Sequence, residues 1–235
     1  MLYYLYTLEK KMKWINKSIE ESKSLKDHYN LHEIDIIIKD TLPDHIDMDF
    51  VMKYISTRVP SYLLRGIDII YVGQFDFLIN KQANALYEDG AIYITNDQSD
   101  DADMVDDIVH EIAHAVEDNW TDLIYGDNQL QREFLRKRKD LYGVLLNNNQ
   151  TPPPPQFLAS LSYDEAIDDY LYKEIGYTAL WSYVSGIFPS PYAATSLREY
   201  FARGFEEYFI GDRKSLTNGF NVLYSKIEDL VELEE

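Results

Sequence analysis

Residues 103–118 carry a strong helical pattern that divides this segment into two faces. One face has apolar residues at the i, i+3, i+4 and i+7 spacing of a helix that packs on a core. Its members are Val105, Ile108, Val109, Ile112, Ala113 and Val116. The other face has ionisable residues in the same register, namely Asp107, His110, Glu111, His114 and Asp118. We therefore expect a helix that is buried on one side and carries a polar stripe on the other.

The polar stripe contains the motif H-E-x-x-H, from His110 to His114. A helix turns ~100° per residue, so the two imidazoles lie ~40° apart on one face. Both can therefore bind one zinc ion, with Glu111 beside them as a candidate general base. Asp107 and Asp118 could each accept a hydrogen bond from the second ring nitrogen of a metal-bound histidine. The alternative is a solvated helix face on which these side chains are ordinary surface polar groups.

A third protein ligand is needed, because hydrolytic zinc sites combine three protein ligands with one water. The chain has five histidines, none after His114, and no cysteine. A ligand from the later part of the chain must therefore be a carboxylate. Glu133, 19 residues after His114, competes with Glu199, 85 residues after it; Glu206 and Glu207 are further candidates.

Each of the two leading candidates has a distinct sequence context. Glu133 precedes Arg136 and Lys137, so a surface ion pair within one helix also explains it. Glu199 stands at the start of an aromatic helical face. Tyr192 lies seven residues earlier and could donate a hydrogen bond to an oxyanion at the metal. We therefore favour Glu199.

Two separated motifs, HEIAHAVED at 110–118 and YAATSLREYFARGF at 192–205, support this preference. Together they resemble the catalytic domain of anthrax lethal factor and the Pro-Pro endopeptidases of related Gram-positive bacteria, which are gluzincin metallopeptidases. The resemblance implies that His110, His114 and Glu199 bind one Zn2+ ion, that Glu111 is the general base and that Tyr192 stabilises the transition state. Arg203 stands where lethal factor has a second acid. Glu206 or Glu207 could replace that acid.

The order of predicted elements fits an α+β, zincin-like metallopeptidase fold. We expect strands at 33–38, 67–77 and 91–95, and helices at 3–27, 49–64, 163–184 and 220–235. The chain would be one catalytic domain, 1–235, with an N-terminal lobe of mixed sheet (about 1–119) and a mostly helical C-terminal lobe (about 120–235) that includes an insertion (about 126–185). Ala91, Ile92 and Tyr93 would form the sheet edge that binds extended peptide, although an inner strand fits the same residues.

The charge of the chain limits its partners. The net charge is −19, which disfavours nucleic acid and anionic membranes and favours basic or neutral substrates. A basic run at 132–139 is interpreted as a solvated helix face rather than a binding patch. The first residues fit neither a secretory signal nor a membrane span, so we expect a cytoplasmic protein or one delivered without a signal peptide.

These observations favour a zinc-dependent endopeptidase that acts on peptides or proteins. Proline-containing peptides are candidate substrates, and the proline run at 152–155 is either a spacer loop or an internal inhibitor. One alternative is a catalytically silent zincin-fold protein that belongs to a larger assembly of unknown partners. Another is an aminopeptidase that uses Glu133 as its third ligand.

Overall fold

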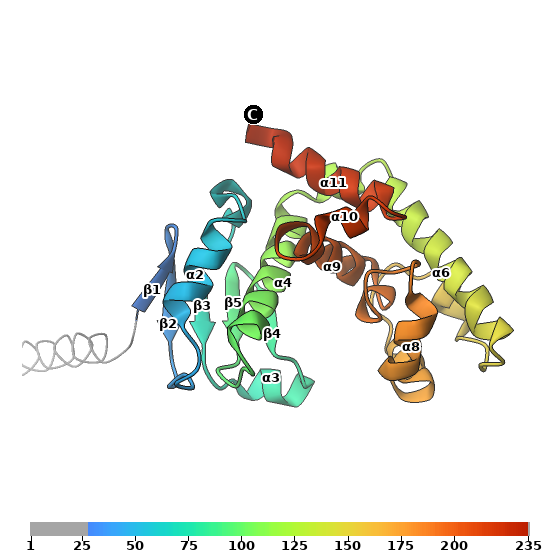
Figure 1. Cartoon of the computed structure of the whole chain (residues 1–235), viewed down its shortest axis with the longest axis horizontal. Helices are drawn as coiled ribbons and strands as arrows, with labels where there is room; N and C mark the ends of the chain where they lie inside the picture. The colour runs from blue at the N-terminus through green and yellow to red at the C-terminus, as the bar shows by residue number, and fades with distance from the viewer. Residues whose placement is uncertain (1–27, 235) are drawn as a thin grey trace, which may run out of the picture.

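The computed structural model describes residues 28–234 and has an α+β architecture (Figure 1). The predicted helix at 3–27 lies outside the described residues. A mixed sheet with its packed helices forms one side, and a largely helical portion forms the other. None of the helices in the described part of the chain is long and apolar enough to cross a membrane.

Within residues 28–234, the sheet has five strands in the order β1-β2-β3-β5-β4. The strands are β1 (His28–Leu31), β2 (Ile34–Ile38), β3 (Ile69–Val72), β4 (Ala85–Glu88) and β5 (Ala91–Ile94). The three central strands run parallel, while β1 and β4 pair antiparallel at the two sides. The predicted strands at 33–38 and 91–95 are thus confirmed, whereas β1 and β4 were not foreseen.

The strand β5 is an inner strand, which corrects the prediction for Ala91, Ile92 and Tyr93. Asp89 and Gly90 both adopt positive φ angles, of 48° and 83°, and form a two-residue hairpin turn. This turn folds β4 back along the outer side of β5. Among the described residues, β4 is therefore the edge of the sheet on this side.

Two helices, α2 (Met48–Ser56) and α4 (Asp101–Asn119), pack together against the sheet. The sheet residues that meet them alternate along each strand, as with the fully buried Ile36, Ile70 and Ile92. Asp100 caps α4 by accepting hydrogen bonds from the amides of Ala102 and Asp103. The apolar stripe of α4 is buried as predicted, while Glu111 on its polar stripe reaches the outer strand β4.

The remaining elements follow in chain order. Before α4 come η1 (Ser61–Leu64) and α3 (Asp76–Lys81). After α4 come α5 (Thr121–Tyr125), α6 (Gln129–Asn147), η2 (Pro155–Leu158), α7 (Glu165–Asp169), η3 (Tyr170–Ile175) and α8 (Tyr177–Val184). The last group is η4 (Tyr192–Ala194), α9 (Leu197–Phe209), α10 (Arg213–Leu216), α11 (Asn221–Val231) and η5 (Glu232–Glu234).

The helix α9 joins the two sides of the molecule. Tyr200, Phe201 and Phe205 are fully buried on it, and α9 packs along α4. On its other side, a side chain at Gly204 would collide with Leu223, since a Cβ atom there would lie 2.4 Å from Leu223 Cδ2. Glycine at this position therefore permits the close approach of α11.

The basic run at 132–139 is a solvated face only in part: Arg132, Arg136 and Lys139 are exposed, whereas Lys137 and Arg138 are buried in α6. Arg138 is completely buried, and Lys137 and Glu133 are each 4 % exposed. The Glu133 carboxylate accepts hydrogen bonds from the Tyr200 hydroxyl (2.9 Å) and from the first amides of α11, those of Val222 (3.2 Å) and Leu223 (3.1 Å). Glu133 thus stabilises the start of α11 and ties α6 to α9.

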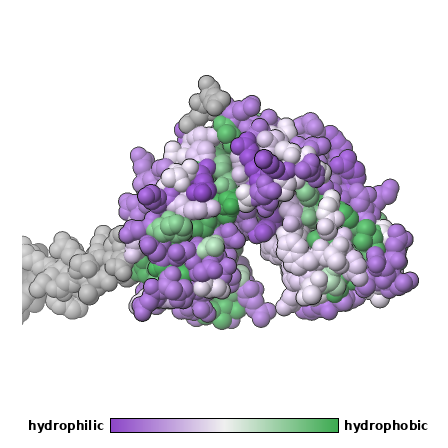
Figure 2. Space-filling view, in the orientation of Figure 1, coloured by the Kyte–Doolittle hydropathy of each residue, from purple (hydrophilic) through white to green (hydrophobic). Residues whose placement is uncertain are grey.

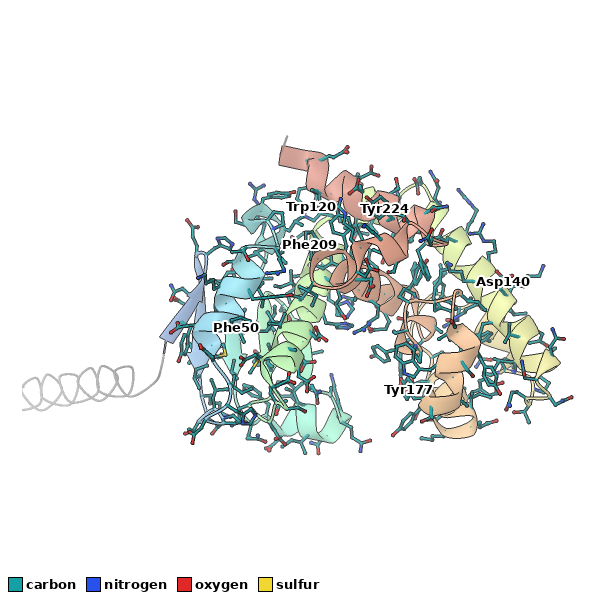
Figure 3. All side chains as sticks on the ribbon, in the orientation of Figure 1. Phe50, Trp120, Asp140, Tyr177, Phe209 and Tyr224 are labelled. Atoms are coloured by element: carbon teal, nitrogen blue, oxygen red, sulfur yellow. The ribbon has the colours of Figure 1, made fainter. Side chains whose placement is uncertain are left out.

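Replacing Glu133 should therefore reduce stability. We expect Glu133→Ala to lower the free energy of unfolding by roughly 3 kcal/mol, because two buried amides and a buried hydroxyl lose a charged acceptor. Urea denaturation measures the effect. Asp140→Asn is the matched control, since Asp140 lies exposed on the outer side of the same helix (Figure 3). An equal loss in both variants would contradict the role given to Glu133.

Candidate metal centre

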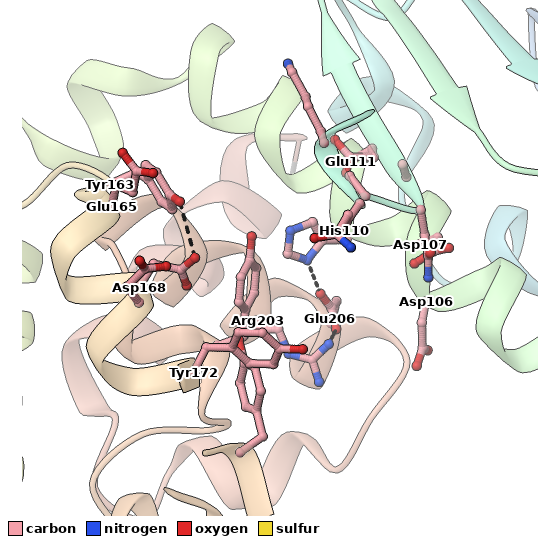
Figure 4. A pocket seen from close by; sticks show the side chains of 18 of the residues that line it. Asp106, Asp107, His110, Glu111, Tyr163, Glu165, Asp168, Tyr172, Arg203 and Glu206 are labelled. Carbon is pink, nitrogen blue, oxygen red and sulfur yellow. Dashed lines mark hydrogen bonds and ion pairs between the residues drawn. The ribbon is translucent and has the colours of Figure 1, made fainter. Parts of the chain in front are cut away.

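The helix α4 presents His110 and His114 side by side. Their ring centroids are 4.8 Å apart, and the ring planes are nearly perpendicular. Both side chains are mostly buried. His110 and Glu111 project into a cleft (Figure 4), and both histidines line an adjoining cavity. The i, i+4 spacing of the motif thus brings both imidazoles to the same site.

Glu199 reaches the histidines from the first turn of α9. Ser196 caps this helix by accepting a hydrogen bond from the Glu199 amide (3.2 Å). Because α9 packs along α4, the Glu199 carboxylate lies with Oε2 3.0 Å from His110 Nε2 and Oε1 3.7 Å from His114 Nε2. The sequence-predicted set of three residues is therefore brought together.

His110, His114 and Glu199 form a group that could hold a metal ion. One ligand atom from each lies within 4.8 Å of the others. Ligands at zinc-like distances of 2.0–2.2 Å in tetrahedral geometry are about 3.3 Å apart, close to the two carboxylate–imidazole distances. Glu199 Oε2 is buried and accepts no well-directed hydrogen bond from the described residues, although His110 Nε2 lies 3.0 Å away. A cation at this point would satisfy it.

The outer ring nitrogens of both histidines contact buried carboxylates. His110 Nδ1 lies 2.5 Å from Glu206 Oε1, and His114 Nδ1 lies 3.3 Å from Glu117 Oε2. Such contacts orient each ring and leave Nε2 directed at the metal position. Although burial lowers the pKa of His110, the adjacent Glu199 and Glu206 carboxylates raise it to about 10. Metal binding here must therefore displace a proton.

Each of these orienting carboxylates is itself held by an arginine of α9. Arg203 forms an ion pair with Glu206, and Arg198 Nε donates to Glu117 Oε2 at 2.8 Å. The Tyr125 hydroxyl also donates to Glu117. Arg203 therefore supports the acid that contacts His110.

The predicted orienting acids, Asp107 and Asp118, do not contact the histidine rings. Asp107 accepts a hydrogen bond from Gln98 Nε2 at 2.8 Å, and burial raises its pKa to about 6. Asp118 lies 3.4 Å from Arg198 Nη2 at the surface. Glu117 takes the role at His114 because it lies one turn from that histidine on the same face, at i+3. This i+3 spacing is visible in the sequence.

Glu111 lies beside this group of candidate ligands, with 6 % of its surface exposed. Its Oε2 accepts a hydrogen bond from the Tyr87 amide of β4 at 2.5 Å. Burial raises the pKa of Glu111, although the neighbouring histidines oppose this shift. A carboxylate of raised pKa at a metal-adjacent position is suited to accept and return a proton.

Tyr192 faces the same centre from η4, with its ring centroid 6.2 Å from that of His110. Burial and the nearby Glu199 carboxylate raise the pKa of Tyr192. Its phenol therefore stays protonated at neutral pH and can donate a hydrogen bond into the cleft.

Several other predicted residues lie away from this centre. Glu133 is engaged at the start of α11, and Glu207 accepts hydrogen bonds from Ser215 and from the Asp212 amide. Tyr93 stacks on Tyr71 at 5.5 Å. The residues lining the two cavities beside the histidines include neither Glu133 nor any of Ala91, Ile92 and Tyr93.

The cleft beside the histidines has a volume of about 950 Å³ and separates two walls (Figures 2 and 4). One wall is α4, with Asp106 and Asp107. The other comes from the predicted insertion, with Tyr163, Glu165 and Asp168. An adjoining cavity of about 480 Å³ is bordered by Leu86, Tyr125, Leu161, Leu197 and Arg198. The sequence did not reveal that the insertion supplies a wall of the site.

Comparisons with protein-family models, curated protein sequences and solved structures gave no significant match. The arrangement of the side chains therefore carries the functional argument.

Metal content should depend on Glu199 and not on Glu133. We expect Glu199→Ala to lose bound metal, because two imidazoles alone make an incomplete hydrolytic site. Glu133→Ala should retain metal despite its lower stability. Elemental analysis of folded, purified proteins provides the measurement. Loss of metal only in the Glu133 variant would transfer the ligand role to that residue.

Proposed function

We propose that the protein is a zinc-dependent endopeptidase with a zincin-like fold. The observation that carries this proposal is the group of His110, His114 and Glu199 in an open cleft with Glu111 alongside. Two imidazoles and one carboxylate, with room for water, are a typical ligand set of catalytic zinc. A purely structural zinc site would need no adjacent base.

The residues divide the reaction among them. Zinc held by the three ligands would acidify a water molecule and polarise the scissile carbonyl group. Glu111 takes the proton from the attacking water and passes it to the leaving amine. The Tyr192 phenol donates a hydrogen bond to the oxyanion. Glu206 and Glu117 keep both imidazoles oriented throughout.

The edge strand β4 is suited to bind the backbone of the substrate. Ala85 and Tyr87 line the cavities at the metal centre. The Thr95 amide donates to Asn84 O, so Asn84 faces β5 and the alternation along β4 turns the backbone groups of Ala85 and Tyr87 outward. An extended peptide can therefore add to this edge by β-augmentation.

The alternative functions receive less support. The aminopeptidase proposal needs Glu133 as a ligand, but the Glu133 carboxylate binds Tyr200 and the start of α11. A silent interaction protein would not require Glu111 beside the ligands. For the proline run, the residues that line the two described cavities include none of 151–155. Thr151 O instead accepts from the Tyr170 hydroxyl, which favours a spacer loop over an internal inhibitor.

Glu111→Gln tests the mechanism. The variant should keep its fold and its zinc, since Glu111 is not a ligand, while kcat falls by about 10²- to 10⁴-fold because the proton acceptor is lost. Peptide cleavage is followed by mass spectrometry, and zinc content is measured on the same samples. Unchanged cleavage by the zinc-loaded variant would refute the role of Glu111.

The charge of the cleft should make it prefer cationic peptides. Asp106 and Asp168 line the cleft and form no ion pair in the part of the chain that the structure describes. We expect a peptide with lysines near the cleaved bond to have a higher kcat/KM than its glutamine counterpart, and Asp106→Asn or Asp168→Asn to reduce that ratio about two- to fivefold each. Asp140→Asn is the control. The preference should weaken with added salt; equal rates for both peptides would contradict it.

A further inference from the structure

Arg138 of α6 is a fully buried cation whose hydrogen bonds all go to main-chain carbonyl groups. Its Nη1 donates to Phe157 O (3.1 Å) and Ser160 O (2.8 Å). Its Nε donates to Ala194 O (3.0 Å), and its Nη2 donates to Thr195 O (2.6 Å). One guanidinium thus joins two chain segments that are separated in sequence.

Burying a cation in this position is unfavourable in free energy. Among the described residues, Arg138 forms no ion pair with a carboxylate, and its guanidinium lies near the rings of Phe134 and Phe157. Burial lowers its pKa to about 10, so it remains charged at neutral pH. Burying a charge is unfavourable unless hydrogen bonds offset the lost hydration. An apolar side chain would fill the same space without that cost, but it could not bind four carbonyl groups.

The two segments that Arg138 joins both lead into the cleft. The carbonyls of Phe157 and Ser160 precede Tyr163 on the wall formed by the insertion. The carbonyls of Ala194 and Thr195 lie between Tyr192 and Ser196, which caps the helix carrying Glu199. A further bond from the Leu197 amide to Leu161 O (2.8 Å) ties the same two segments together. The guanidinium therefore lies behind the turn that presents Tyr192.

We propose that Arg138 is a positioning residue that holds the turn of Tyr192 at the reaction centre and couples the insertion to it. The catalytic part of this inference rests on the proposed function, because it assumes that Tyr192 acts on the oxyanion. The positional part does not depend on catalysis. The planar fork of arginine is required, because lysine cannot bind carbonyl groups in the same fixed directions.

Lys137, the preceding residue, provides a matched control. It is also buried on α6 and also donates to a carbonyl group, that of Gly219 (2.7 Å), while lying over the Phe220 ring. Its contacts are at the start of α11 and not at the turn of Tyr192. Removing either cation should destabilise the protein, but only removal of Arg138 should loosen that turn.

Hydrogen exchange on the metal-free protein tests the positional part. In Arg138→Met, the amides of residues 192–196 should exchange about tenfold faster or more, because the turn loses hydrogen bonds to a charged donor. Arg138→Lys should show a smaller acceleration and serves as the second variant if Arg138→Met does not fold. Lys137→Met should leave 192–196 unchanged. Unchanged exchange in the Arg138 variants, or equal acceleration in Lys137→Met, would overturn the proposal.

A double-mutant cycle tests the catalytic part on zinc-loaded protein. Arg138→Lys should lower kcat roughly 10- to 100-fold with little change in KM, because the donor is misplaced while the substrate-binding edge is intact. In a Tyr192→Phe background the same substitution should add almost no further loss. Additive losses would overturn the link to Tyr192. If no peptide is cleaved by the wild-type protein, the proposed function fails, while the exchange result still decides the positional role.

Discussion

The packing of α9 along α4 is the contact on which both the fold and the candidate site depend. Across this contact, the Glu199 carboxylate of α9 faces the imidazoles of His110 and His114 on α4. The ion pairs of Arg198 and Arg203 with the acids that orient the histidines lie in the same interface. Loosening this contact would therefore disturb the packing and the arrangement of the candidate metal ligands together.

The sequence predicted the parts of the site that depend on local spacing. Helical periodicity placed the two histidines and Glu111 on one face, and the absence of later histidines required a carboxylate. Contacts between distant segments could not be read from local spacing: Glu206, proposed with Glu207 as a replacement acid through the resemblance, meets His110 across 96 positions of the chain. The strand β4 was missed because its residues, Ala-Leu-Tyr-Glu, lack an alternating pattern.

The basic run on α6 shows a further limit of composition as a guide. Charged residues usually indicate solvent, yet three of them in this run are internal connectors. Each of the three binds main-chain groups of another segment. Whether a charge on α6 is solvated or buried therefore depends on residues distant in sequence, which a local pattern cannot reveal. These side chains join α6 to α9, to the start of α11 and to the segments that lead into the cleft.

The hydrogen bond between Glu111 and the Tyr87 amide has a consequence for where a peptide would be cut. The Tyr87 amide is then not available to a strand that adds to β4. Ala85 is the nearest outward-facing residue whose backbone N–H and C=O groups are not bound by Glu111. The Glu111 carboxylate thereby fixes one position along β4, at Tyr87, relative to the candidate metal ligands. The register in which a peptide pairs with β4 would then select the bond presented to the metal, as much as any side-chain pocket does.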